Sequence, residues 1–169
     1  MPLTIRDFTD DDTQATARLF HDTVRTASGP PTYDARQRAA WAPKVPDTAA
    51  WGARLAAATT LVAEDASGLA GFMSLERAGD RASHIEMAFV RADRIGGGVA
   101  KALYDALIRR AQAADLDHLS TDASAMARRF FERQGWTVIR EQQPVRGGVT
   151  LTNYRMELRM PGGSVGAKR

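Results

Sequence analysis

Two side chains that can exchange protons, His84 and Glu86, lie two positions apart in the run Ser83–Val90. Alternate residues of a β-strand point to the same face, so the spacing predicts that His84, Glu86, Ala88 and Val90 share one face. Imidazole titrates near neutral pH and a carboxylate accepts protons, so this pair suits general acid–base chemistry. A carboxylate in an apolar strand is costly without a partner or a task. A catalytic role for Glu86, direct or through water, and a structural hydrogen bond both stay open. The alternative for His84 is an exposed side chain.

Three consecutive glycines, Gly96, Gly97 and Gly98, follow this strand. They precede residues 99–114, where apolar side chains recur at helical spacing. The first amides of a helix have no partner within it and carry the positive end of its dipole, so a bare helix start after a strand is typical of a phosphate or pyrophosphate site. A flexible turn is the alternative. Neither a Walker loop nor the dinucleotide fingerprint Gly-x-Gly-x-x-Gly is present.

The composition is that of an ordinary soluble domain. The chain has 169 residues, 44% hydrophobic and 25% charged, with a formal charge of +3 and no cysteine. The absence of cysteine excludes a disulfide framework, a thiol nucleophile and a thiolate metal site. His21 and His118 have no companions at ligand spacing, so we predict no metal. No basic run interleaved with aromatics indicates nucleic acid, no apolar run is long enough to span a membrane, and the N-terminus does not resemble a signal peptide. We therefore expect a cytoplasmic protein.

The rest of the sequence pattern predicts a mixed α/β single domain over 1–160, followed by a disordered tail over 161–169. Helices are predicted over 11–26 and 99–114 and from the cap Ser124 to Gln134, with two short helices, capped by Asp34 and by Asp47 or Thr48, within 28–58. Strands are predicted over 3–8, 59–64, 68–75, 83–90, 117–122, 136–142 and 149–160.

Two motifs resemble those of the GNAT superfamily of acyl-CoA-dependent N-acetyltransferases. After Val90, the segment Ile95-Gly96-Gly97-Gly98-Val99-Ala100 is similar to the family's Gln/Arg-x-x-Gly-x-Gly/Ala motif, matching at Gly98 and Ala100 and departing at Ile95. The segment Ser124–Trp136 is similar to Asn-x-x-Ala-x-x-x-Tyr-x-x-x-Gly-Phe, with Phe131 in place of the tyrosine that often protonates the leaving thiolate. A phenyl ring cannot donate that proton.

Further segments resemble a narrower, largely bacterial subgroup. Its Tyr-x-x-x-Gln-x-x-x-Trp-Ala-Pro segment is found at Tyr33–Pro43, preceded by Val24-Arg25 and followed near the C-terminus by Asn153-Tyr154-Arg155-Met156. The resemblance covers about residues 3 to 160. It implies a mostly antiparallel twisted sheet of about seven strands, splayed between strands 4 and 5 and flanked by helices.

The resemblance also implies a function, the transfer of an acetyl group from acetyl-CoA to a primary amine of a small molecule or peptide. Acetyl-CoA would lie between the splayed strands, with its pyrophosphate on the amides of the glycine loop. The cofactor-binding candidates are Ala88, Phe89, Val90, Ile95, Gly96, Gly97, Gly98, Val99, Ala100, Lys101, Ser124 and Phe131. The acceptor-binding candidates are Arg25, Tyr33 and Trp41, and the catalytic candidates are Glu86, His84 and Tyr154.

Several alternatives stay open at this point. Lys101 is either a phosphate ligand or a solvated lysine, and Tyr154 is either a proton donor or a packed aromatic. A non-catalytic acyl-CoA-binding module of the same fold is the main competing function, because Ile95 and Phe131 depart from the motifs. A nucleotide-binding protein that uses the glycine loop is a third interpretation. The resemblance also allows a homodimer through the last strands.

Overall fold

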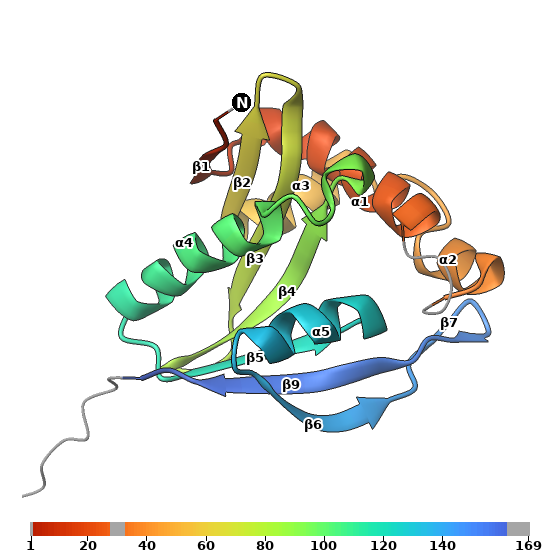
Figure 1. The fold of residues 1–169 in the computed structure, drawn as a ribbon. Helices are drawn as coiled ribbons and strands as arrows, with labels where there is room; N and C mark the ends of the chain where they lie inside the picture. The colour runs from red at the N-terminus through yellow and green to blue at the C-terminus, as the bar shows by residue number, and fades with distance from the viewer. Residues whose placement is uncertain (1, 28–32, 162–169) are drawn as a thin grey trace, which may run out of the picture.

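The computed structural model describes residues 2–27 and 33–161 of the chain (Figure 1). The tail predicted over 161–169 lies, apart from its first residue, outside the described residues. The helices are α1 (Thr13–Ala27), α2 (Ala35–Trp41), α3 (Thr48–Ala57), α4 (Val99–Ala113) and α5 (Ala125–Arg133), and short 3₁₀ turns cover Asp10–Asp12 and Ala92–Arg94. The strands are β1 (Thr4–Asp7), β2 (Thr59–Asp65), β3 (Gly68–Arg77), β4 (Ala82–Val90), β5 (His118–Ala123), β6 (Thr137–Gln142), β7 (Val145–Arg146), β8 (Val149–Thr150) and β9 (Asn153–Arg159).

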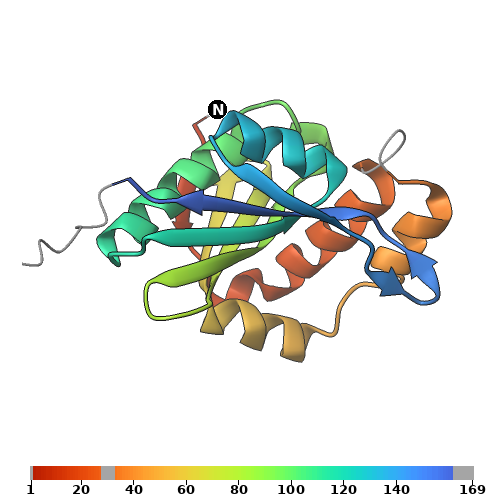
Figure 2. The same cartoon turned by 90° about the horizontal axis from the view of Figure 1, so that it is seen from below.

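Seven strands form one twisted sheet in the order β1-β2-β3-β4-β5-β9-β6. Every neighbouring pair is antiparallel except β4 and β5, which run parallel. Helices cover both faces: in Figure 2, α4 and α5 lie above the sheet and α1 and α3 below it. This arrangement confirms the predicted fold class.

Each face of the sheet has its own apolar core. On one face, Leu55 of α3 packs with Phe72 and Met87 of the sheet. On the other, Leu103 of α4 packs with a larger cluster that includes Phe131 of α5. Of the apolar residues at helical spacing in α4, Val99, Leu103, Leu107 and Ala111 are buried and Ile108 is half-buried, and Tyr104 is buried as well.

Side-chain caps fix where three helices begin. Asp34, Asp47 and Ser124 each accept a hydrogen bond from the backbone amide three positions further on, at 2.8, 3.1 and 3.1 Å respectively. Such caps satisfy a donor that the helix itself leaves without a partner. The helices predicted from these capping residues are confirmed.

Strands β4 and β5 separate part-way along their length. Their pairing ends at Ile85 and Thr121, although β4 continues through residues 86–90. Figure 1 shows β4 and β5 diverging. The splay leaves the β5-facing edge of residues 86–90 without a neighbouring strand, as the resemblance implied.

A β-bulge at Glu86 changes which side chains share a face of β4. Ile85 pairs with Leu75 and Met87 pairs with the adjacent Ser74, so Glu86 is the extra residue. Because the extra residue shifts the alternation, Ile85 packs in the core beneath α4 whereas Met87 packs in the core beneath α3.

The bulge corrects one prediction. His84 and Glu86 do lie together, with His84 Nε2 3.5 Å from Glu86 Oε2. Ala88 and Val90, however, pack against the α4 core on the opposite face. The simple alternation used for the prediction does not hold across a bulge.

The segment predicted as one strand over 149–160 is divided in two. Its first part, β8, pairs with β7 in a separate hairpin closed by Gly147 and Gly148, both at positive φ. Contacts from the chain around α2 hold this region: Tyr33 Oη donates to the carbonyl of Thr152 at 2.6 Å, and Gln37 Nε2 donates to the carbonyl of Thr150 at 3.2 Å. These carbonyls are therefore bonded outside the main ladder, and β9 begins only at Asn153.

Candidate active site

A cavity of about 460 Å³ opens where β4 leads into α4. We call it the glycine-loop cavity. Its walls come from the end of β4, the loop of residues 94–98, the first turn of α4, and α5. Gly71 of β3 lets α4 start close to the sheet, because a Cβ there would lie 2.8 Å from the carbonyl oxygen of Phe89 and 3.1 Å from Val99.

The start of α4 requires glycine for conformational reasons. Gly96 and Gly98 have φ of +82° and +86°, a region that other residues adopt only with strain. The space where a side chain of Gly98 would lie is open. Gly97 donates its amide to the carbonyl of Arg94 at 3.1 Å, and the amide of Ala102 donates to Gly98 at 3.0 Å. The amides of residues 98–101 lie between these two bonds, at the start of the helix, and are free to bind an anion.

A second cavity, of about 580 Å³, lies on the other side of the splay. We call it the His84 cavity. Aromatic rings from α1, α2, α3 and β4 form one wall, His84, Glu86 and Asp122 lie along the two diverging strands, and Arg146 contributes from the β7–β8 hairpin. This cavity therefore combines a hydrophobic wall with groups that can take up a proton.

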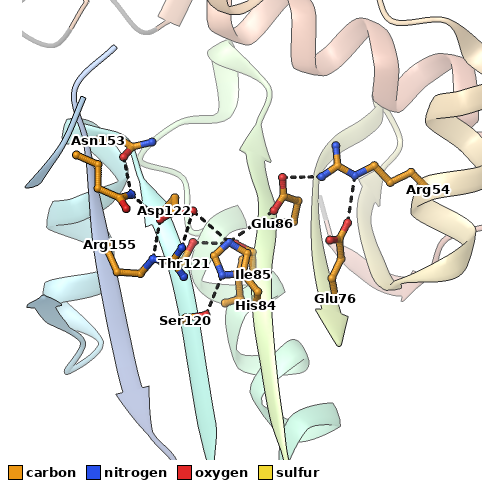
Figure 3. A network of polar contacts seen from close by, with 11 residues as sticks. Arg54, Glu76, His84, Ile85, Glu86, Ser120, Thr121, Asp122, Asn153 and Arg155 are labelled. Atoms are coloured by element: carbon orange, nitrogen blue, oxygen red, sulfur yellow. Dashed lines mark hydrogen bonds and ion pairs between the residues drawn. The ribbon is translucent and has the colours of Figure 1, made fainter. Parts of the chain in front are cut away.

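His84 is the centre of a polar network (Figure 3). Its Nδ1 lies 2.8 Å from Ser120 Oγ. Its Nε2 lies 3.5 Å from Glu86 Oε2 and 3.6 Å from Asp122 Oδ2, so the imidazole stands between two carboxylates. A proton arriving at Nε2 would therefore be stabilised from both sides.

Two arginines hold those carboxylates in place. Arg54 Nη2 lies 2.6 Å from Glu86 Oε1, and Arg155 Nε lies 2.9 Å from Asp122 Oδ1. Burial lowers the pKa of His84 below its ordinary 6.5, and the charges of the nearby carboxylates oppose this effect only in part. The imidazole is consequently neutral at pH 7 and able to accept a proton.

The two cavities meet in the splay between β4 and β5. The residues that line both are Trp41, Ala88, Phe89, Ser124, Ala127 and Phe131. A molecule bound along the glycine loop can thus reach a molecule bound beside His84. This shared boundary is the geometry that a group transfer between two bound substrates needs.

Comparison with known proteins agrees with this geometry. A family model described as an acetyltransferase (GNAT) domain matches residues 30–158. The chain belongs to the GNAT acetyltransferase family.

Individual relatives are similar over nearly the whole chain. The chain is 32% identical over 153 residues to the uncharacterized N-acetyltransferase YafP of Escherichia coli (strain K12), covering 90% of this chain and 93% of that protein. A crystal structure of a GCN5-related N-acetyltransferase from Rhodopseudomonas palustris superposes with a TM-score of 0.84 at 29% identity, covering 95% and 97% of the two chains. The acetyltransferase yncA of Salmonella typhimurium, described as putative and solved with its cofactor acetyl-CoA, has the same fold with a TM-score of 0.74 at 20% identity, covering 94% of each chain.

Most of the cofactor-binding candidates line the glycine-loop cavity of this GNAT chain. The exception is Gly97, whose amide is already bonded to Arg94. Ile95, which departs from the family motif, is 46% exposed at the rim. Lys101 forms an ion pair with Asp105 one turn along α4, so its charge is partly neutralised before any ligand binds.

The other candidates divide between the cavity and the scaffold. His84, Glu86, Tyr33 and Trp41 line the His84 cavity. Burial, with a smaller contribution from Tyr154, raises the pKa of Tyr33 to about 12, so its hydroxyl stays a donor to Thr152.

The structure does not bring Arg25 and Tyr154 to either cavity. Arg25 Nη1 lies 3.4 Å from the carbonyl of Ala42 at the end of α2. The ring of Tyr154 lies beneath the guanidinium of Arg128, 4.6 Å from its Cζ, and packs against the core.

Sequence reasoning missed Arg54, Asp122 and Arg146, which also line the His84 cavity. Asp122 reaches His84 only because β5 lies parallel beside β4, and no local pattern shows this pairing. Arg54 comes from a helix remote in the chain. Arg146 reaches the cavity from the β7–β8 hairpin, which is separate from the main sheet.

Two further findings bear on the chemistry. No helix among residues 2–27 and 33–161 is long and apolar enough to cross a membrane. Within the same residues no group of three or more possible ligands is arranged to hold a metal ion.

Proposed function

We propose that this protein is an N-acetyltransferase that transfers the acetyl group of acetyl-CoA to a primary amine by direct attack. The observation that carries the proposal is the shared boundary between the two cavities, at Ala88 and Phe89 of β4 and Ser124 and Phe131 of α5 and its cap. The amine nitrogen bonds to the thioester carbon, the carbon–sulfur bond breaks, and coenzyme A leaves as a thiolate.

The glycine-loop cavity fits the acyl-CoA substrate. In this proposal the amides of Gly96, Gly98, Val99 and Ala100 hold the pyrophosphate at the positive end of α4. The β4 edge left open by the splay can pair with the amide-containing pantetheine arm, as an added strand would. An amide on this edge would also polarise the thioester oxygen.

The His84 cavity supplies the proton acceptor that an amine needs, because an ammonium cannot attack. With Nδ1–H donating to Ser120 Oγ, His84 Nε2 is free to accept the proton of the bound ammonium. The resulting imidazolium lies between Glu86 and Asp122 and is stabilised by both. Glu86 faces the acceptor, and it assists this proton transfer directly or through a water molecule.

The leaving thiolate needs a donor other than Phe131. Among the residues that line both cavities, Ser124 carries a hydroxyl. Its Oγ accepts the amide of Ala127 at 3.1 Å, which fixes the oxygen while leaving its own hydrogen available. We assign the Ser124 hydroxyl as the group that passes a proton to the sulfur: it donates its own hydrogen to the thiolate and takes up the second proton that the attacking nitrogen loses as the amide forms.

The experiment is an acetyl-transfer assay with acetyl-CoA and a panel of primary amines, measuring free thiol release and the acetylated product by mass spectrometry. We expect thiol and acetyl-amine in equal amounts, and a large loss of rate in Glu86→Gln. Acetyl-CoA binding with no transfer to any amine would instead support the non-catalytic acyl-CoA-binding module.

A further inference from the structure

The charged side chains linked to His84 carry a net negative charge. With His84 neutral, the linked network holds three carboxylates and two guanidinium groups, and so one net negative charge. The carboxylates are Glu76, Glu86 and Asp122, and the guanidinium groups are Arg54 and Arg155. One negative charge beside a neutral imidazole suits a bound ammonium, which is the form in which a primary amine arrives at neutral pH.

The same cavity is also lined by a positively charged side chain that lies outside this network. Arg146, on β7, lines the cavity and makes no ion pair or side-chain hydrogen bond with the described residues. The cavity's other lining arginine, Arg54, is bonded to two glutamates. Arg146 is exposed and precedes the Gly147-Gly148 turn, so its guanidinium is available to a carboxylate or another acidic group of a ligand.

The wall of the cavity is an aromatic surface. Phe20 packs against Phe89 and Trp51 with ring centroids 5.0 and 5.2 Å apart, and Trp41 lies 5.5 Å from Tyr33. All five rings line the His84 cavity. Such a surface favours an apolar or aromatic molecular body over a chain with many hydrogen-bonding groups.

From these three features we infer that the acceptor is a small zwitterion, a primary amine joined to an acidic group by an apolar or aromatic body. The ammonium binds beside Glu86 and His84, the body lies on the aromatic wall, and the acidic group pairs with Arg146. A polyamine or a plain aryl amine would leave Arg146 without a partner. This inference rests on the proposed function, since it takes the His84 cavity as the acceptor site.

The test compares matched ligands that differ only in the acidic group, by calorimetric titration into protein saturated with CoA. The pairs are 6-aminohexanoate against pentylamine, and 4-(aminomethyl)benzoate against benzylamine. In the wild type we expect at least one acid to bind about tenfold more tightly than its partner, as for a charge-assisted bidentate contact. Arg146→Gln should bring the ratio close to one. Arg109→Gln, an equal charge change on the exposed face of α4, should leave it unchanged.

A charge reversal makes the test independent of any loss of packing. Arg146→Glu should invert the preference, so that 4-(aminomethyl)benzylamine binds more tightly than 4-(aminomethyl)benzoate. Equal affinities within both pairs in the wild type, or an unchanged ratio in Arg146→Gln, would overturn the inference.

Parallel turnover measurements separate this inference from the proposed function. Selective binding of the acids without acetyl transfer would refute the proposed function and leave the zwitterion site standing. Acetylation of the plain amines without preference for the acids would support the proposed function and overturn the zwitterion site.

Discussion

Replacing Gly98 with alanine should separate the cost of strain from the loss of cofactor binding. Gly98 has φ of +86°, and a Cβ built there meets nothing within 4 Å. The substitution therefore adds no clash, and its cost is that of placing an L-residue in the left-handed region, about 1–2 kcal/mol. For a domain of this size we expect a fall in Tm of about 2–8 °C.

The same substitution should weaken acetyl-CoA binding by more than the strain alone suggests. A loop that relaxes toward negative φ turns at least one amide away from the pyrophosphate. A hydrogen bond to a charged group contributes about 1.5–3 kcal/mol, which corresponds to a rise in Kd of about 10- to 140-fold.

Gly135 provides the matched control. It follows α5, has φ of +90°, and also has open space around its Cβ. It lines neither cavity. Gly135→Ala should lose as much thermal stability as Gly98→Ala, measured by thermal unfolding, yet keep the wild-type Kd in calorimetric titration with acetyl-CoA. Equal Kd values for the two variants would refute the assignment of the loop as the pyrophosphate site.

Four further predictions follow from the site and its scaffold. Glu86→Gln should lower kcat by about 10²- to 10⁴-fold while leaving the acetyl-CoA Kd unchanged, since Glu86 lies outside the glycine-loop cavity; a wild-type kcat would exclude its catalytic role. Because His84 must be neutral and burial lowers its pKa, kcat at saturating amine should fall only below pH 6.5. His84→Asn should abolish that acidic limb, and a limb that persists would point to another group. Ser124→Gly should lower kcat at a cost of only a few tenths of a kcal/mol, whereas Ser124→Ala should also lose about 1 kcal/mol of stability with its cap; full activity in Ser124→Gly would remove the hydroxyl from the mechanism. Finally, Arg6 lowers the pKa of Asp12 from its ordinary 3.8, so the free energy of unfolding should fall as the pH drops from that value through the lowered pKa. Arg6→Gln should reduce this slope in acid titrations followed by denaturant unfolding, and an unchanged slope would contradict the assignment.

The sequence predicted best what local spacing determines. The step from β4 through the glycines to α4 depends on apolar periodicity and on residues that tolerate positive φ, and both can be recognised in a short window. The cap at Ser124 is equally local, because its partner amide lies three positions away.

What the sequence could not show depends on contacts between distant segments. The bulge at Glu86 arises from the register of β4 against β3, and it reverses the faces of Ala88 and Val90. Asp122 reaches His84 only through the parallel pairing of β5 with β4. The periodicity of a single sequence carries no information on either strand pairing, so it could not identify Asp122 as the second carboxylate beside His84.

The division of the last strand has the same origin. The alternation over 149–160 is compatible with a single strand, but Tyr33 bonds the carbonyl of Thr152 from a segment 119 positions away. That contact, together with the Gly147-Gly148 turn, places Arg146 at the His84 cavity. The residue on which the acceptor inference depends is therefore positioned by long-range packing.

The most direct test of the account is a crystal structure with CoA bound. The account predicts the pyrophosphate on the amides of Gly98, Val99 and Ala100, and the thiol at the boundary of the two cavities, within reach of Ser124. A thiol that points away from the His84 cavity, or a pyrophosphate bound outside the glycine loop, would contradict it.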